Sequence, residues 1–186
     1  MTYRENVEQF ISQFDITHSV TVDIDYRYSL YRTEKYQDLF KQDLKIFIHQ
    51  LNRRFYGRKS SKKNYNEELP IVIPCIENIN NKFQPIHFHF ALGNLRKDKF
   101  SENEIEEMIR KSWYSTKFHE KNKNKSVVVK EIFFKEGWIN YITKEMEHKN
   151  ESCVLFDLIQ TSKYVNWLLL EIARRMSFYK TMMYES

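Results

Sequence analysis

One short stretch decides how this chain folds, Pro85–Leu92, whose sequence is PIHFHFAL. Polar and apolar residues alternate through it, so we expect a β-strand with its apolar side chains directed into the core. His87 and His89 then project from the opposite face, about 6.6 Å apart along the strand. The stretch therefore predicts a buried sheet and a pair of imidazoles held on rigid backbone.

The neighbouring segments complete a hairpin with this strand. Leu69–Glu77 is mostly apolar and is predicted to be a strand, which tolerates Pro74 only at a sheet edge or a bulge. The polar residues 78–84 between the two strands are typical of a turn. We therefore expect Leu69–Glu77 and Pro85–Leu92 to pair.

Two further strands are predicted. Residues 19–26 (SVTVDIDY) alternate strictly, with valine and isoleucine on one face and Thr21, Asp23 and Asp25 on the other. Val127–Phe134 is rich in β-branched and aromatic residues, which favour a strand.

Helices are predicted where apolar residues recur at helical spacing. These are Val7–Phe14, Tyr36–Phe55, a helix that begins at the S-x-x-E capping box of Ser101 and Glu104, Trp138–Glu147, and an amphipathic helix over about 162–180. After the first helix, strands and helices follow one another in the order βαββαβα(α). This order predicts an α+β fold with helices packed on an antiparallel sheet.

Composition limits the classes of protein to which the chain can belong. Its 186 residues show no linker or repeat, so we expect a single domain over 1–186. No apolar stretch is long enough to span a membrane, and the first residues do not resemble a signal peptide. Only Cys75 and Cys153 are present, which favours a reducing cytoplasm. The net charge of +5 permits a polyanionic partner.

His87 and His89 are the first candidate site residues. Two imidazoles side by side can chelate one divalent ion, although the same pattern also occurs on the wet face of an amphipathic strand. The predicted hairpin brings Glu77 beside them. Two imidazoles and one carboxylate leave positions open for water and substrate, as a catalytic Mg²⁺ or Mn²⁺ centre requires.

Other ligands near this site stay open. Cys75 shares the parity of Glu77 and could supply a thiolate to a structural Zn²⁺ site, but a small core residue is the simpler interpretation. Asp23 and Asp25 could face the metal if the first strand lies next to the hairpin.

Tyr141 and Lys144 form a second candidate pair. On a helix they are three residues apart and share one face. A tyrosine has a pKa near 10 and needs neighbouring positive charge to act as a nucleophile. Lys144 could supply that charge and could stabilise a phosphorane-like transition state. Most of the 12 tyrosines must be structural, so the pair alone is a weak signal.

A basic segment follows the long second helix. It combines positive charges with an aromatic ring, a composition that suits phosphates and stacked bases and also suits a solvated surface. Its candidate DNA-binding residues are Arg53, Arg54, Tyr56, Arg58 and Lys59.

Taken together, His87-Phe88-His89, the preceding Glu77 and the following Tyr141-x-x-Lys144 resemble the HUH endonuclease superfamily. The chain is most similar to the single-tyrosine initiators (Rep proteins) of rolling-circle replication, over roughly Ser19 to Glu147. Residues 19–26 match the family's first motif only loosely. No second tyrosine stands near Tyr141, unlike in the two-tyrosine initiators.

The resemblance implies a metal-dependent nickase that recognises a DNA sequence or an origin hairpin. His87, His89 and Glu77 would bind Mn²⁺ or Mg²⁺. Tyr141 would attack a DNA phosphodiester to give a 5′-phosphotyrosine link and a free 3′-hydroxyl, with Lys144 as the assisting cation. The link keeps the bond energy, so the enzyme could also rejoin strands.

The implied partners are single-stranded or hairpin DNA and a helicase from the host or from the genetic element, a plasmid or a virus. A homodimer is compatible with the sequence. Two alternatives remain open, a non-catalytic DNA-binding regulator that keeps the fold and a transposase of the same superfamily. A zinc module that uses Cys75, His87 and His89 is a third.

Overall fold

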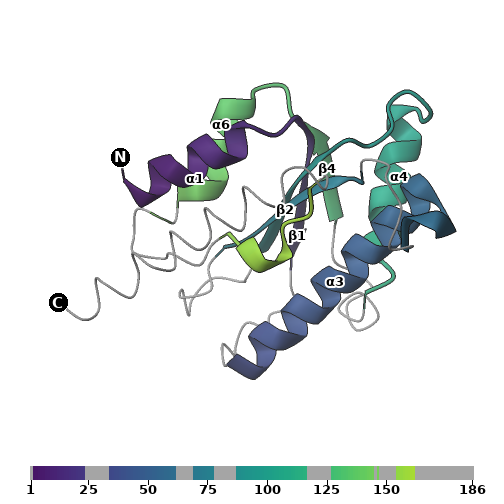
Figure 1. Cartoon of the computed structure of the whole chain (residues 1–186), viewed down its shortest axis with the longest axis horizontal. Coiled ribbons are helices and arrows are strands. Elements are labelled where there is room, and N and C mark those ends of the chain that lie inside the picture. Colours follow the sequence, from purple (N-terminus) through teal and green to yellow (C-terminus); the bar gives the residue numbers. More distant parts are fainter. Residues whose placement is uncertain are drawn as a thin grey trace.

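A four-stranded antiparallel sheet lies at the centre of the structure (Figure 1). The structure is a computed structural model that describes residues 2–23, 34–61, 69–77, 87–116, 127–144, 146 and 154–161. The strands are β1 (Ile16–Asp23), β2 (Ile71–Glu77), β3 (His87–Gly93) and β4 (Val127–Glu131), in the spatial order β2-β3-β1-β4. The α-helices among these residues are α1 (Tyr3–Ser12), α3 (Glu34–Tyr56), α4 (Glu102–Trp113) and α6 (Lys135–Thr143), with short 3₁₀ turns at Arg58–Ser61 and Phe156–Leu158. The predicted α+β fold is confirmed.

The strand β3 lies between β2 and β1, and its register places the histidines. On one side, Glu77 is paired with His87 and Cys75 with His89. The antiparallel pairing predicted for the two strands is thus confirmed. On the other side, Thr21 of β1 is paired with His89. Residues paired across an antiparallel sheet share a face, so polar residues of three strands meet on one face.

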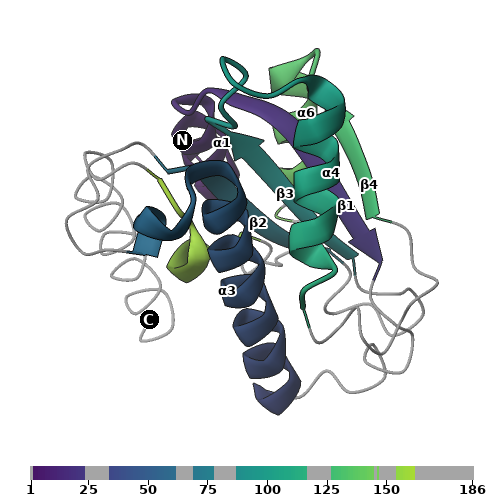
Figure 2. The same cartoon turned by 90° about the vertical axis from the view of Figure 1, so that its right-hand side faces the viewer.

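The two faces of the sheet carry separate cores. Phe88 and Phe90 of β3 are fully buried in a cluster with α3 and α4, whereas Ala91 packs in a second cluster with α1 and α6. Figure 2 shows α3 and α4 side by side in front of the sheet, with α1 behind it. The histidine face is therefore the one that α1 and α6 cover.

Pro74 stands at an edge of the sheet, as its missing N–H requires. The strand β2 is the outermost strand on its side, and the backbone N–H of Leu155 donates to the carbonyl of Pro74 at 2.9 Å. Gln160 exchanges backbone hydrogen bonds with Val72 nearby. Residues 154–160 thus cover this edge without needing a donor from the proline.

Side-chain caps explain where two helices begin. Thr2 and Glu5 form a capping box at the start of α1, and Ser101 and Glu104 form the predicted one at the start of α4. The Glu104 carboxylate accepts from the Ser101 backbone N–H at 2.8 Å. Each box satisfies amide groups that have no partner within the helix.

The boundary between β4 and α6 differs from the prediction. The strand ends at Glu131 rather than at Phe134, and α6 begins at Lys135 rather than at Trp138. Gly137 lies in the first turn of α6, at a position where a β-carbon would stand only 2.4 Å from the ring of Phe134. Because Gly137 has no side chain, the ring of Phe134 can lie against the first turn of the helix.

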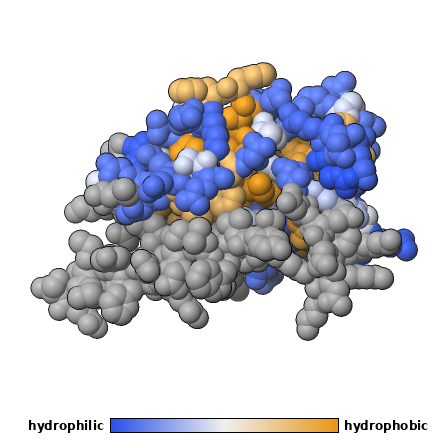
Figure 3. All heavy atoms as spheres, turned by 45° about the horizontal axis from the view of Figure 1, so that its top comes forward, coloured by the Kyte–Doolittle hydropathy of each residue, from blue (hydrophilic) through white to orange (hydrophobic). Residues whose placement is uncertain are grey.

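Phe133 and Phe134 are consequently at the surface, 91% and 68% exposed. Figure 3 shows such apolar areas within a mainly hydrophilic surface. Among the helices that the structure describes, none is both long and apolar enough to cross a membrane. The predicted C-terminal helix over about 162–180 lies outside the described residues.

Candidate functional site

A chain of hydrogen bonds crosses three strands on the face that carries the histidines. The Nε2 atom of His89 lies 2.6 Å from Oε2 of Glu77, and its Nδ1 atom lies 3.1 Å from the hydroxyl of Thr21. The side chain of His89 is 5% exposed and that of Glu77 is 15% exposed. The imidazole is thus held at both nitrogens in a largely dry environment.

The helix α6 adds the second candidate pair to the same place. The ammonium of Lys144, the C-cap of α6, forms an ion pair with Oε1 of Glu77. It also lies over the ring of Tyr141, 3.9 Å from the ring centroid. The ring of Tyr141 meets that of His89 edge to face at 5.4 Å between centroids. Both candidate pairs, predicted from separate motifs, therefore meet in one site.

Charges in this site affect one another strongly. The pKa of Glu77 is lowered to about 2, chiefly by the hydrogen bond from His89. Burial opposes this effect by raising the pKa, and the hydrogen bond and charge of Lys144 lower it further. Burial lowers the pKa of Lys144, but the hydrogen bond and charge of Glu77 outweigh it and raise that pKa above 10.5. At neutral pH the site therefore contains a carboxylate and an ammonium.

The first helix holds α6 in position. Ile139 and Ile142 of α6 are buried in the cluster with α1. Between Tyr141 and Lys144, the buried hydroxyl of Thr143 donates to Glu8 of α1 at 2.6 Å. Arg4 forms an ion pair with the same Glu8 oxygen at 2.7 Å. Contacts on either side of the tyrosine therefore fix the helix against α1.

His87 is the remaining member of the expected metal-ligand set. Its ring is stacked beside that of His89, with 6.4 Å between centroids and an interplanar angle of 26°. Two imidazoles and one carboxylate are a ligand set for a divalent ion. In the part of the chain that the structure describes, no three His, Cys, Asp or Glu side chains converge as a metal site, and Glu77 is bonded to His89 and Lys144. The residues fit a metal by type and strand position, and Lys144 supplies the positive charge at the carboxylate.

The other proposed ligands have different surroundings. Cys75 is paired with His89 in the sheet, but its side chain is buried in the apolar cluster with α1 and α6. This supports its interpretation as a core residue. The condition under which Asp23 could face a metal is met, since β1 lies next to the hairpin and Asp23 is paired with His87. Asp25 lies outside the described residues.

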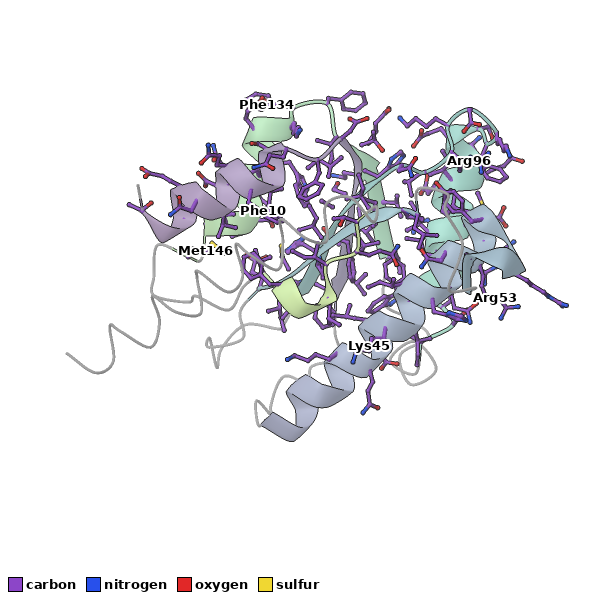
Figure 4. All side chains as sticks on the ribbon, in the orientation of Figure 1. Phe10, Lys45, Arg53, Arg96, Phe134 and Met146 are labelled. Atoms are coloured by element: carbon purple, nitrogen blue, oxygen red, sulfur yellow. The ribbon has the colours of Figure 1, made fainter. Side chains whose placement is uncertain are left out.

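The basic segment lies away from this site. Tyr56 donates to the carbonyl of Asn94, directly beyond the end of β3, whereas His87 is the first residue of that strand. Seven residues of strand separate the two positions by roughly 20 Å. Figure 4 shows Arg53 on the opposite side of the molecule from Met146, which follows α6.

Individual residues of this segment have contacts of their own. Arg54 donates to the carbonyl of Lys111 at 3.2 Å, and Arg96 covers the ring of Tyr56 at 5.3 Å. Arg53 and Arg58 are exposed, and the side chain of Lys59 is not among those that the structure describes. The predicted role of these five residues in DNA binding stays a prediction, at a surface separate from Tyr141.

Sequence reasoning missed two contributors, Thr21 and Glu8. The alternation of residues 19–26 places Thr21 on the acidic face, but only the strand order shows that it meets His89. Nothing in the spacing of Val7–Phe14 indicates that Glu8 accepts from Thr143, 135 residues later.

Comparison with models of protein families, with curated proteins and with solved structures found no match.

Proposed function

We propose that the protein is an endonuclease of the HUH type that nicks single-stranded DNA through Tyr141. The observation that carries the proposal is the contact of Tyr141 and Lys144 with the Glu77–His89 pair. These residues come from a helix and two strands that are far apart in the sequence. A structural tyrosine would not need to be 46% exposed beside a partly buried carboxylate and a lysine.

Tyr141 is the nucleophile of this proposal. A phenol attacks phosphorus poorly unless nearby positive charge favours the phenolate. Lys144 supplies that charge, because Glu77 keeps it protonated and its ammonium lies over the phenol ring. His89 packs edge to face on the ring and limits where the phenol oxygen can point.

The reaction exchanges one phosphodiester for another. The phenol oxygen of Tyr141 forms a bond to phosphorus, and the bond from phosphorus to the 3′ oxygen breaks. The phenol proton leaves to solvent, and the 3′ oxygen takes up a proton to become a hydroxyl. The product, a 5′-phosphotyrosine, is close in energy to the diester, so a 3′-hydroxyl can reverse the step and join strands.

His87, His89 and Glu77 are the residues that would hold Mn²⁺ or Mg²⁺. When bound, such an ion polarises the scissile phosphate and neutralises charge that develops on it. Lys144 contributes further positive charge from the helix side of the site. The exposed position of Tyr141 suits an unpaired strand, whose phosphates can reach the site without duplex stacking.

This activity fits the initiation of rolling-circle replication of a plasmid or virus inside a host cell. The partners would be an origin with a hairpin or unpaired strand and a helicase from the host or the element. The net charge of +5 is in keeping with a nucleic-acid partner.

A covalent-adduct assay tests the proposal. The protein is incubated with a random-sequence pool of labelled single-stranded oligonucleotides and Mn²⁺, and a denaturing gel shows whether label travels with protein. We expect an adduct that is lost with chelator and in Tyr141→Phe. Tyr114→Phe is the matched control, since Tyr114 is 40% exposed at the C-cap of α4. DNA binding without an adduct would instead indicate a regulator.

A further inference from the structure

Thr21 contacts the imidazole of His89, which also contacts Glu77 and Tyr141. It lies on β1 directly opposite His89, and its hydroxyl is 3.1 Å from Nδ1 of that ring. The other ring nitrogen, Nε2, is 2.6 Å from the Glu77 carboxylate. Since the His89 side chain is only 5% exposed, water cannot readily replace either partner.

Counting protons assigns the roles in this arrangement. An ionised carboxylate only accepts hydrogen bonds, so Nε2 of His89 carries a proton and donates it to Glu77. In a neutral ring Nδ1 is then an acceptor, and the hydroxyl of Thr21 donates to it. The hydroxyl of Thr21 therefore supplies the hydrogen bond that Nδ1 needs when the proton is on Nε2.

A metal requires the opposite tautomer. Nε2 can bind a cation only through its lone pair, so that nitrogen must release its proton to solvent. The neutral ring then takes a proton at Nδ1, which becomes a donor. A hydroxyl can donate or accept simply by rotating, so Thr21 can partner either form of the ring.

We propose that Thr21 is a positioning residue that allows His89 to exchange tautomers, so that Nε2 becomes available to a divalent cation. This rests on the proposed function, because it assumes that His89 is a metal ligand. Removing the hydrogen-bond partner of the second nitrogen of a metal-bound histidine typically weakens metal binding by about 10- to 100-fold.

The test measures Mn²⁺ binding to the intact chain by calorimetry, without DNA. We expect Thr21→Val to weaken Mn²⁺ binding by about 10- to 100-fold, because valine can neither donate to nor accept from Nδ1. Thr21→Ser keeps a hydroxyl and should restore most of the affinity. The matched control is Thr17→Val on the same strand, which removes a similar hydrogen bond of 2.9 Å to Nδ1 of His18.

A spectroscopic readout separates positioning from folding. The ¹⁵N shifts of His89 should report a proton on Nε2 in the metal-free protein and on Nδ1 with Mg²⁺. In Thr21→Val, folded by circular dichroism, the Mg²⁺-induced change should require a higher metal concentration.

The outcomes distinguish the two proposals. Equal Mn²⁺ affinity of Thr21→Val and wild type would overturn the role of Thr21 while leaving the nuclease standing. Failure of the wild-type protein to bind Mn²⁺ or Mg²⁺ at all would overturn both the metal site and this inference.

Discussion

The ring of Tyr141 stands perpendicular to the ring of His89, at an interplanar angle of 89° and a centroid distance of 5.4 Å. One ring belongs to the helix α6 and the other to the strand β3. The contact therefore makes the position of the tyrosine depend on how α6 packs against the sheet.

The carboxylate predicts a pH dependence of stability. Folding lowers the pKa of Glu77 from 4.5 to about 2, so its ionised form stabilises the folded state at every pH above 4.5. This stabilisation is lost as the pH falls through the folded-state pKa of about 2. Glu77→Gln should therefore lower the free energy of unfolding by about 2 kcal/mol at neutral pH, and by less than half of that near pH ~3.

Urea denaturation of the metal-free protein at several pH values checks this. Glu107→Gln is the control, because Glu107 forms an exposed ion pair with Lys111 on α4. A wild-type minus Glu77→Gln difference that stays constant down to pH ~3 would contradict the lowered pKa.

The contact between α1 and α6 predicts a loss of order around the tyrosine. Glu8→Gln weakens the hydrogen bond from Thr143 and the ion pair with Arg4, so the free energy of unfolding should fall by about 1–2 kcal/mol. A double-mutant cycle with Thr143→Val should give a coupling of about 1 kcal/mol. In Glu8→Gln, the amides of α6 should exchange faster than in the wild-type protein, while those of α4 should exchange at the wild-type rate. Unchanged exchange in α6 would count against the role of Glu8.

Lys144 is expected to act in the chemical step more than in folding. Lys144→Met keeps the length of the side chain and removes the charge beside Tyr141, so adduct formation should slow by about 100-fold. Lys130→Met, on the exposed part of β4, is the control. Single-turnover rates at saturating DNA measure the effect. An unchanged rate would exclude Lys144 from the reaction.

The basic segment predicts a dependence on DNA length. Arg53 lies in the last turn of α3, three residues before Tyr56, whose contact with Asn94 is roughly 20 Å along β3 from His87. Only a longer DNA strand could span such a distance. Arg53→Ala should weaken binding of oligonucleotides of about 16 nucleotides and leave those of about 4 nucleotides unaffected. Fluorescence anisotropy with Lys45→Ala as control measures this. Equal losses for both lengths would place Arg53 on a different DNA path.

The two alternating stretches account for most of what the sequence could predict. The shared face of His87 and His89 follows from the period of two along a strand. The pairing of the two strands, which puts Glu77 opposite His87, was predicted from the polar segment between them. The pairing of Tyr141 with Lys144 follows from helical spacing alone. These local rules predicted five residues of the site, His87, His89, Glu77, Tyr141 and Lys144, without tertiary information.

Tertiary contacts explain what the sequence could not predict. The strand β1 begins at Ile16, three residues before the predicted start, in a part of the strand where a register irregularity between Ile16 and His18 interrupts the alternation. The partnership of Thr21 with His89 depends on the strand order, and any of several orders fits the same pattern. Phe133 and Phe134 have the composition of a strand, yet they lie at the surface where the chain turns into α6.

The most direct test of the central claim uses the polarity of the covalent link. Single-stranded oligonucleotides labelled at either the 5′ or the 3′ end are incubated with wild-type protein and Mn²⁺, and the adduct is isolated under denaturing conditions. Attack by Tyr141 that leaves a 5′-phosphotyrosine predicts that only the 3′ label remains with the protein, while the 5′-labelled fragment is released with a free 3′-hydroxyl. Retention of the 5′ label, or cleavage without any protein-linked DNA, would contradict the account.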